Sequence, residues 1–380
     1  MEGSLPHDFD EPIGLFTSLG TYARTISTSN PEAQAYFNQG IRLMYAFARA
    51  EAGRSFRAAQ RLDPRCAICY WGEAWAWSPF LSEGRTAEHD AHAYAAIQKA
   101  RAAANRASPV EKALIDAMAA RYVPQFDPAK LNDEDRAYAA AMAGVAESFS
   151  NDNDVATLYA ESMFLGLPRP GALDLHDPNV ARILTVLEGA LKRDIHHPGA
   201  CHMYVHTMEL TSEPRRAEAC VDFLGSAMPG ASHLVHMPTH IWTRVGRWGD
   251  AVRASVRAWQ ADQKGVRGDA IVTYPAHALQ MLVYSASYDG QRAPAISAAR
   301  GIPNLTGDPM YLALAFVRFG RFDEVTTMGD RPTAVIPGGM WDFAHGYAAL
   351  RGGDSQGARE YLNQVLRAAA TAATFKFHPA

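Results

Sequence analysis

The chain has 380 residues, 48% of them hydrophobic and 20% charged, so it is apolar enough to bury a large core, which excludes an intrinsically disordered protein. A formal net charge of -4 gives no basic surface for nucleic acid. The N-terminus is acidic where a signal peptide is cationic, and no apolar run approaches the ~18 residues of a membrane span. We therefore expect a cytoplasmic protein that binds neither nucleic acid nor membrane.

A tetratricopeptide pattern begins near residue 36. The pattern is counted from Gly40. An aromatic residue, Tyr36, lies four positions before it, and small or apolar residues lie 12, 16, 19 and 24 positions after it, namely Ala52, Phe56, Ala59 and Pro64. This spacing is typical of two antiparallel helices that cross closely, with a proline that ends the second. Each such hairpin needs neighbours to cover its apolar face.

Further hairpins are predicted where a short turn is followed five residues later by a small residue that opens a second helix. These pairs are Ser212 and Ala217, Gly246 and Ala251, Gly290 and Ala295, Gly320 and Val325, and Gly353 and Ala358. Alternating β-branched runs are almost absent. The sequence thus predicts an all-α fold, a right-handed α-α superhelix of tetratricopeptide-like helical hairpins.

We expect residues 1–30 to be an N-terminal extension and residues 31–380 to form a single superhelical domain. Within it, residues 31–83 hold the first repeats, 84–180 degenerate helical repeats, 181–290 the histidine-bearing repeats and 291–380 the C-terminal repeats.

The four cysteines, Cys66, Cys69, Cys201 and Cys220, are too few for a disulfide scaffold of this size. A reducing compartment keeps them as thiols, available for packing or as ligands. Cys66 and Cys69 form one CxxC, but zinc needs a second such pair. Packing and thiol redox chemistry both stay open for this pair.

Two histidine pairs carry the strongest functional signal. His202 and His206 are four residues apart, as are His236 and His240, so each pair lies on one face of a helix and can reach one ion. The two pairs are 34 residues apart, which is the tetratricopeptide period. We therefore expect them on the first helices of adjacent repeats, with the imidazoles meeting between the helices.

Other residues near these pairs complete the candidate site. Glu209 continues the face of His202 and His206 and is predicted to orient a ligand or accept a proton, and Tyr204 is a second candidate catalytic residue. His277 lies near the start of the next first helix and is a further candidate ligand. The neighbouring His196 and His197 are expected at the surface or as helix caps.

Pro238 interrupts the second pair, because proline removes a backbone hydrogen bond and clashes with the preceding turn of a helix. Either a helix begins near Pro238 and leaves His236 on the entering loop, or the helix kinks there.

Four stretches carry a family resemblance, namely FNQGIRLMYAFARAEAGRSF, LDPRCAICYWGEA, HHPGACHMYVHTMELT and HLVHMPTHIWTRVGRWGDAV. Through them the chain resembles large bacterial tetratricopeptide-like proteins over nearly its whole length. The resemblance implies that the motifs HPGxxHxxxH and HxxHMPxHI are hallmarks of the group, and these map onto His197, His202, His206, His233, His236 and His240. The sequence departs from the group at Gln280, where relatives carry a histidine, which puts a full ligand set from the third helix in doubt.

Imidazole ligands suit copper, zinc, iron and nickel, whereas a hard ion prefers more carboxylates than this face offers. We therefore predict a metal-dependent enzyme with copper as the first choice and iron or zinc as alternatives. Its reaction is a redox modification of a small-molecule substrate bound in the concave groove. Two alternatives stay open, a non-catalytic scaffold that binds a peptide or protein partner and a zinc-dependent hydrolase.

Overall fold

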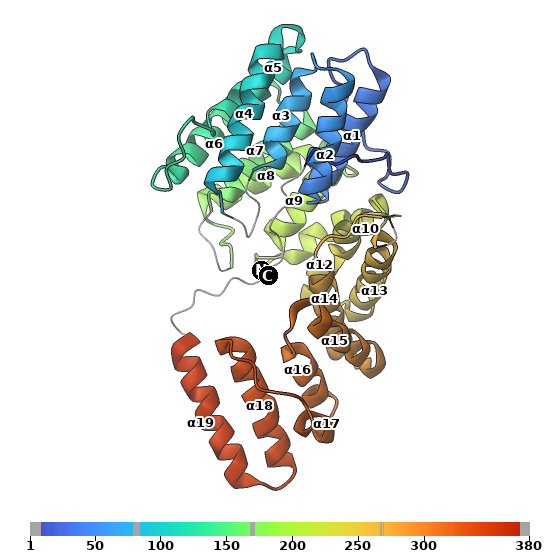
Figure 1. Cartoon of the computed structure of the whole chain (residues 1–380), viewed down its shortest axis with the longest axis vertical. Coiled ribbons are helices and arrows are strands. Elements are labelled where there is room, and N and C mark those ends of the chain that lie inside the picture. Colours follow the sequence, from blue (N-terminus) through green and yellow to red (C-terminus); the bar gives the residue numbers. More distant parts are fainter. Residues whose placement is uncertain (1–8, 79–83, 168–171, 267, 269, 373–380) are drawn as a thin grey trace. The chain divides into compact units, whose positions relative to one another are not determined.

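The computed structural model describes residues 9–78, 84–167, 172–266, 268 and 270–372, and these residues are mostly helical (Figure 1). The helices in chain order are α1 (Pro31–Tyr45), α2 (Arg49–Leu62), α3 (Ala67–Ala76), α4 (Ala87–Ala103), α5 (Pro109–Ala119), α6 (Leu131–Ser148), α7 (Asn153–Leu165), α8 (Pro178–Arg193), α9 (Pro198–Met208), α10 (Glu218–Ala227), α11 (Ser232–His236), α12 (Pro238–Arg244), α13 (Trp248–Gly265), α14 (Pro275–Tyr288), α15 (Arg292–Thr306), α16 (Met310–Arg318), α17 (Phe322–Thr326), α18 (Val335–Arg351) and α19 (Ser355–Ala372). Two 3-10 helices, Ala104–Arg106 and Pro214–Ala217, accompany them. Strand-like pairing in the described part of the chain is confined to one bridge between Ala231 and Ile271. The predicted all-α fold is confirmed.

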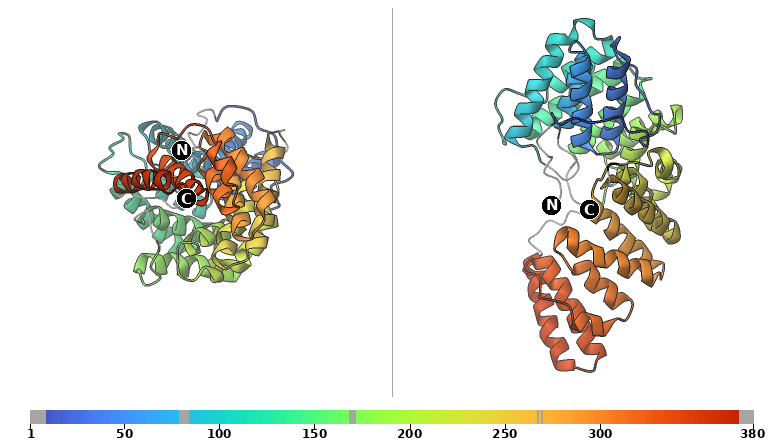
Figure 2. Two further views of the ribbon diagram at one scale, coloured as in Figure 1. Left: turned by 90° about the horizontal axis from the view of Figure 1, so that it is seen from below. Right: turned by 45° about the vertical axis from the view of Figure 1, so that its right-hand side comes forward.

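The first hairpin, α1 and α2, forms as the sequence predicts, and its two helices lie side by side in Figure 2. Asn30 starts α1 by accepting hydrogen bonds from the backbone of Glu32 and Ala33. At the crossing, a Cβ atom on Gly40 would lie 2.5 Å from the buried ring of Phe56, so only glycine allows this approach. The small and aromatic repeat positions therefore mark helix contacts.

Glycines in a left-handed conformation make the later turns. Gly290 joins α14 to α15, Gly320 joins α16 to α17 and Gly353 joins α18 to α19, with φ between 67° and 89°. Glycine takes such angles without the clash that a Cβ atom causes. These three turns confirm the hairpins predicted there.

The chain divides into two compact units. The first comprises Met1–Pro168, Ala172–Ile241 and Ala261–Thr273, and the second consists mainly of Trp242–Gln260 and Tyr274–Ala380. The second unit has its own apolar core, which includes Leu279, Ile302 and Phe316. The single superhelical domain over residues 31–380 stays a prediction.

The break at Pro238 takes the first of the two predicted forms, since α12 begins at this proline. His236, however, does not lie on a loop, because it ends the short helix α11. The backbone N–H of Met237 donates to the carbonyl of His233, so the two short helices follow one another almost directly. His233 and His236 therefore lie on α11, whereas His240 lies on the separate helix α12.

The expectation of free thiols is wrong, because the structure pairs all four cysteines. Cys66 is bonded to Cys69 at the start of α3, and Cys201 on α9 is bonded to Cys220 on α10. Their Cα atoms are 5.4 and 5.0 Å apart, within the range that a disulfide spans. The second bond ties α9 to its neighbour next to His202.

Among the helices that the structure describes, none has both the length and the apolar character needed to cross a membrane.

Candidate metal centre

Helix α9 holds two of the candidate ligands and is buried along its whole length. Pro198 occupies its first position, and the side chain of His197 caps the helix by accepting the Ala200 backbone N–H at 3.0 Å. His202 and His206, one turn apart, point to the same side. Their Nε2 atoms lie 3.1 Å from each other. The capping role expected for His197 is thus confirmed.

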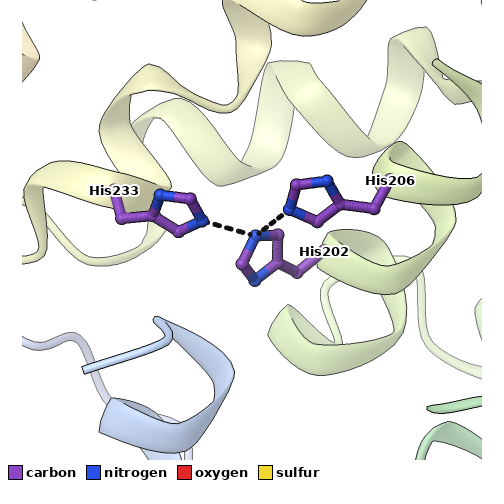
Figure 3. Close-up of side chains that lie close together, drawn as sticks. All are labelled: His202, His206 and His233. Atoms are coloured by element: carbon purple, nitrogen blue, oxygen red, sulfur yellow. Dashed lines mark hydrogen bonds between the residues drawn. The ribbon is translucent and has the colours of Figure 1, made fainter. Parts of the chain in front are cut away.

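A third imidazole comes from α11. The Nε2 atom of His233 lies 3.2 Å from that of His202, and Figure 3 shows the three rings converging from two helices. One ligand atom from each of His202, His206 and His233 fits within a span of 4.8 Å. All three side chains are buried. Nitrogens bound to one ion at about 2.0–2.1 Å lie roughly 3 Å apart, and the two Nε2 separations from His202 are close to this value. We call these residues the histidine trio.

The opposite nitrogen of each ring is engaged by the protein. The Nδ1 atom of His202 donates to the backbone carbonyl of Tyr45 at 2.6 Å, because a carbonyl oxygen only accepts. His206 Nδ1 donates to the carboxylate of Glu209 at 2.7 Å. When either ring is neutral, this contact places its proton on Nδ1, and Nε2 presents a lone pair. Metal-binding histidines are held by outer partners of this kind.

The outer partner of the third ring is another histidine. His233 Nδ1 lies 3.2 Å from Nε2 of His236. When His233 donates its Nδ1 proton in this contact, its Nε2 also presents a lone pair to the trio. His236 is then an outer partner that fixes the direction of His233.

A cation at the centre of the trio would suit its nitrogens. When the rings of His202 and His206 are both neutral, their Nε2 lone pairs face each other at 3.1 Å, and a positive charge between them stabilises this arrangement. Burial lowers the pKa of His202 well below its usual value, and the charge of His206 lowers it further, so a proton is poorly held there. A transition-metal ion fits this set of donors.

Glu209 links the trio to His240. Its carboxylate contacts Nδ1 of His206 at 2.7 Å and Nδ1 of His240 at 2.5 Å. Burial alone raises the pKa of Glu209, but the charge of His240 and the hydrogen bond from His206 outweigh it, so this pKa lies far below the usual range. The ionised carboxylate thus contacts both rings, and its role as an orienting residue stays a prediction.

Tyr45, the partner of His202, is itself held from two sides. Its hydroxyl donates to buried Asp154 at 2.5 Å. Its ring packs so closely on Gly199 that a Cβ atom there would come within 2.3 Å of it. The motif HPGxxHxxxH therefore combines a helix cap, a close contact and two ligands.

The sequence-predicted residues divide as follows. His202 and His206 lie in the trio, while His236 and His240 are connected to it through His233 and Glu209. His277 lies in the first turn of α14, in the second unit, and its role as a ligand stays a prediction.

Tyr204 does not face the trio. It follows His202 by two residues, which places it on the opposite side of α9. Its hydroxyl donates to Glu188 on α8 at 2.7 Å. Its predicted catalytic role is therefore not supported by its position.

His233 was not among the predicted ligands, although it belongs to the motif HxxHMPxHI. Its separation from His202 is 31 residues, three fewer than the repeat period that pointed to His236. Its HxxH spacing from His236 is the signal that reveals it.

Two solved structures that are similar to the chain share little sequence with it. No family model and no curated protein matches the chain. Among solved structures, the apo form of RapI is 9% identical, with a TM-score of 0.41 over 91% of this chain and 99% of that one. The tetratricopeptide domain of P58(IPK) is 14% identical, with a TM-score of 0.23 over 90% and 100%. The site must be interpreted from its own residues.

Proposed function

We propose that the chain binds a transition-metal ion through Nε2 of His202, His206 and His233, and uses it as an enzyme to modify a small molecule by redox chemistry. One observation carries this proposal: three buried imidazoles converge, with Nδ1 of His202 and His206 held by fixed acceptors. In the neutral rings this arrangement turns the Nε2 lone pairs toward one another, as ligands of a shared ion require. Catalytic metal sites with three protein ligands leave a position for substrate.

Copper is our first choice, with iron and zinc as alternatives. Neutral imidazole suits all three, and the three convergent donors include no carboxylate. Copper or iron bound there supplies one-electron chemistry, whereas zinc supplies Lewis acidity for hydrolysis. The identity of the ion therefore separates the redox enzyme from the zinc-dependent hydrolase.

Glu209 has the most direct supporting role among the chain's own residues. Its negative charge strengthens His206 as a donor, because it stabilises the Nδ1 proton of that ring. It also holds a proton next to the centre through His240. We therefore assign it orientation of the ligand and a share in proton transfer.

The cytoplasmic location expected from the sequence stays a prediction. The two disulfides favour an oxidising compartment instead, since reducing compartments keep most cysteines as thiols.

The test is metal content measured by elemental analysis on protein purified without an affinity tag. We expect one ion per chain in the wild type. His202→Ala and His233→Ala each remove a donor, so affinity falls by more than the roughly 10- to 100-fold that an outer partner costs.

His196→Ala is the matched control, because His196 is exposed and lies six residues before His202 on the chain. It is expected to keep the full metal content. A wild-type protein that binds no copper, iron or zinc at stoichiometric concentration contradicts the proposal. A peptide-binding scaffold is then the better description.

A further inference from the structure

Phe47 has an unusual backbone conformation for a residue with a side chain. Its φ is 61°, and among the residues that the structure describes only one other non-glycine residue, Tyr274, has a positive φ. For an L-residue this left-handed region brings Cβ close to the following carbonyl oxygen and is strained. Phe47 sits at the turn between α1 and α2.

The turn at Phe47 is a standard helix end in which this position is normally glycine. The Phe47 N–H donates to the Met44 carbonyl, and the Ala48 N–H donates to the Leu43 carbonyl, which is the Schellman pattern. In that pattern the left-handed residue is usually glycine, since it has no Cβ.

Four later turns of the same chain supply an internal comparison. The same bond from residue i to residue i-5 recurs from Arg247 to Trp242, Gln291 to Ala286, Arg321 to Phe316 and Asp354 to Ala349. In each, the residue before the donor is a glycine with positive φ: Gly246, Gly290, Gly320 and Gly353. Phe47 occupies the equivalent position in the first hairpin. A glycine at position 47 would make the same turn without strain, so the strain comes from the side chain of Phe47 and not from the turn.

The ring of Phe47 lies against all three members of the histidine trio. Its centroid is 3.9 Å from that of His202, 4.9 Å from His233 and 5.3 Å from His206. It is nearly parallel to the ring of His206, with 11° between the planes. The side chain is 7% exposed, the same fraction as that of His206, so the ring packs on the trio inside the fold.

We propose that Phe47 is the gate of the metal centre, so that a ligand reaching the ion, or an ion leaving it, must displace this ring. The inference rests on the proposed function and adds a residue that determines access. Strained backbone that persists where glycine is the ordinary choice points to a selected side chain.

Phe47→Gly tests the gate, because glycine fits the turn and removes only the ring. With the copper-loaded protein, we expect a strong chelator to remove the ion at least tenfold faster than from the wild type. Added azide, a small exogenous ligand, is expected to change the visible spectrum of the copper at a concentration at least tenfold lower. Circular dichroism of both proteins checks that the helices are retained.

Phe47→Leu is the control for apolar volume. It keeps the left-handed backbone and an apolar side chain without the flat ring, and we expect a release rate between those of the wild type and Phe47→Gly. Release from Phe47→Gly at the wild-type rate overturns the gate, as does a folded Phe47→Gly that binds no copper while the wild type binds it. A wild type that binds no metal contradicts the proposed function instead, so the two failures are distinguishable.

Discussion

At the scale of single residues, the properties of the trio follow from where each proton is held. A buried imidazole with a lowered pKa, such as His202, exposes its lone pair at neutral pH because protons compete poorly for it. Glu209 has the opposite character, since its partners keep it ionised although it is buried. A buried nitrogen that holds a proton poorly and a nearby ionised carboxylate are together favourable for the ion of the proposed function.

Asp262, on α13, is a buried carboxyl whose partner Ser232 precedes His233, and it gives a pH-dependent prediction. Burial raises its pKa to about 6, against the lowering effect of Ser232 and Thr273. Because this exceeds the unfolded value of about 3.9, the native state resists ionisation. The free energy of unfolding therefore falls as the pH rises from about 4 to above 6, by roughly 2–3 kcal/mol in all.

Asp262→Asn removes this ionisation. Urea unfolding is expected to show the variant more stable than the wild type at pH 8, with the difference vanishing at pH 4. Asp116→Asn, on the exposed side of α5, makes the same change in charge and serves as the control. An equal gain at both pH values would refute the burial effect.

At the scale of helices, the sequence was a good guide to the repeats and a partial guide to the site. Gly40 and Phe56 could be predicted to mark a hairpin, because close helix crossings leave local spacings of small residues. The 34-residue register pointed to His236 because it assumes one continuous helix. The break at Pro238 creates a separate helix α11, and His233 on it reaches the trio instead.

The contribution of the first hairpin could not be predicted. Tyr45 and Phe47 contact the trio through a backbone carbonyl and a strained turn, and neither leaves a local pattern that links it to residues 202–233. Only the folded chain brings them together.

The contact between α1 and α9 is predicted to depend on Gly199. A Cβ atom there would lie 2.3 Å from the Tyr45 ring, so Gly199→Ala forces the helices apart. We expect a loss of about 1–3 kcal/mol in the free energy of unfolding, measured with urea.

The matched control is Gly189→Ala on α8, where the nearest atom would be 3.9 Å away on the flexible Arg193 side chain. There alanine favours the helix, and a gain of about 0.5–1 kcal/mol is expected. The same sign of change in both variants would show that the Tyr45 contact is unimportant.

At the scale of the whole molecule, the trio lies entirely in the first unit. An ion that binds only the native state stabilises it by about 2.7 kcal/mol at a free concentration 100 times the dissociation constant. We therefore expect copper to slow amide hydrogen exchange in α9 and α11, measured by mass spectrometry. The helices α18 and α19 of the second unit are the internal reference and are expected to exchange at unchanged rates. Slowing that is uniform over the chain would argue against a site at the trio.

The hydrogen bond from His202 to Tyr45 joins residues 157 positions apart. Contacts between such distant segments form late, because the chain must first close a long loop. During synthesis, the first hairpin is made long before α9, so its contact with α9 forms only after α9 has also been synthesised. Under the proposed function, the trio therefore becomes able to take up a metal only after the N-terminal and central segments have met, and the rate of metal uptake would report the last steps of folding in this unit.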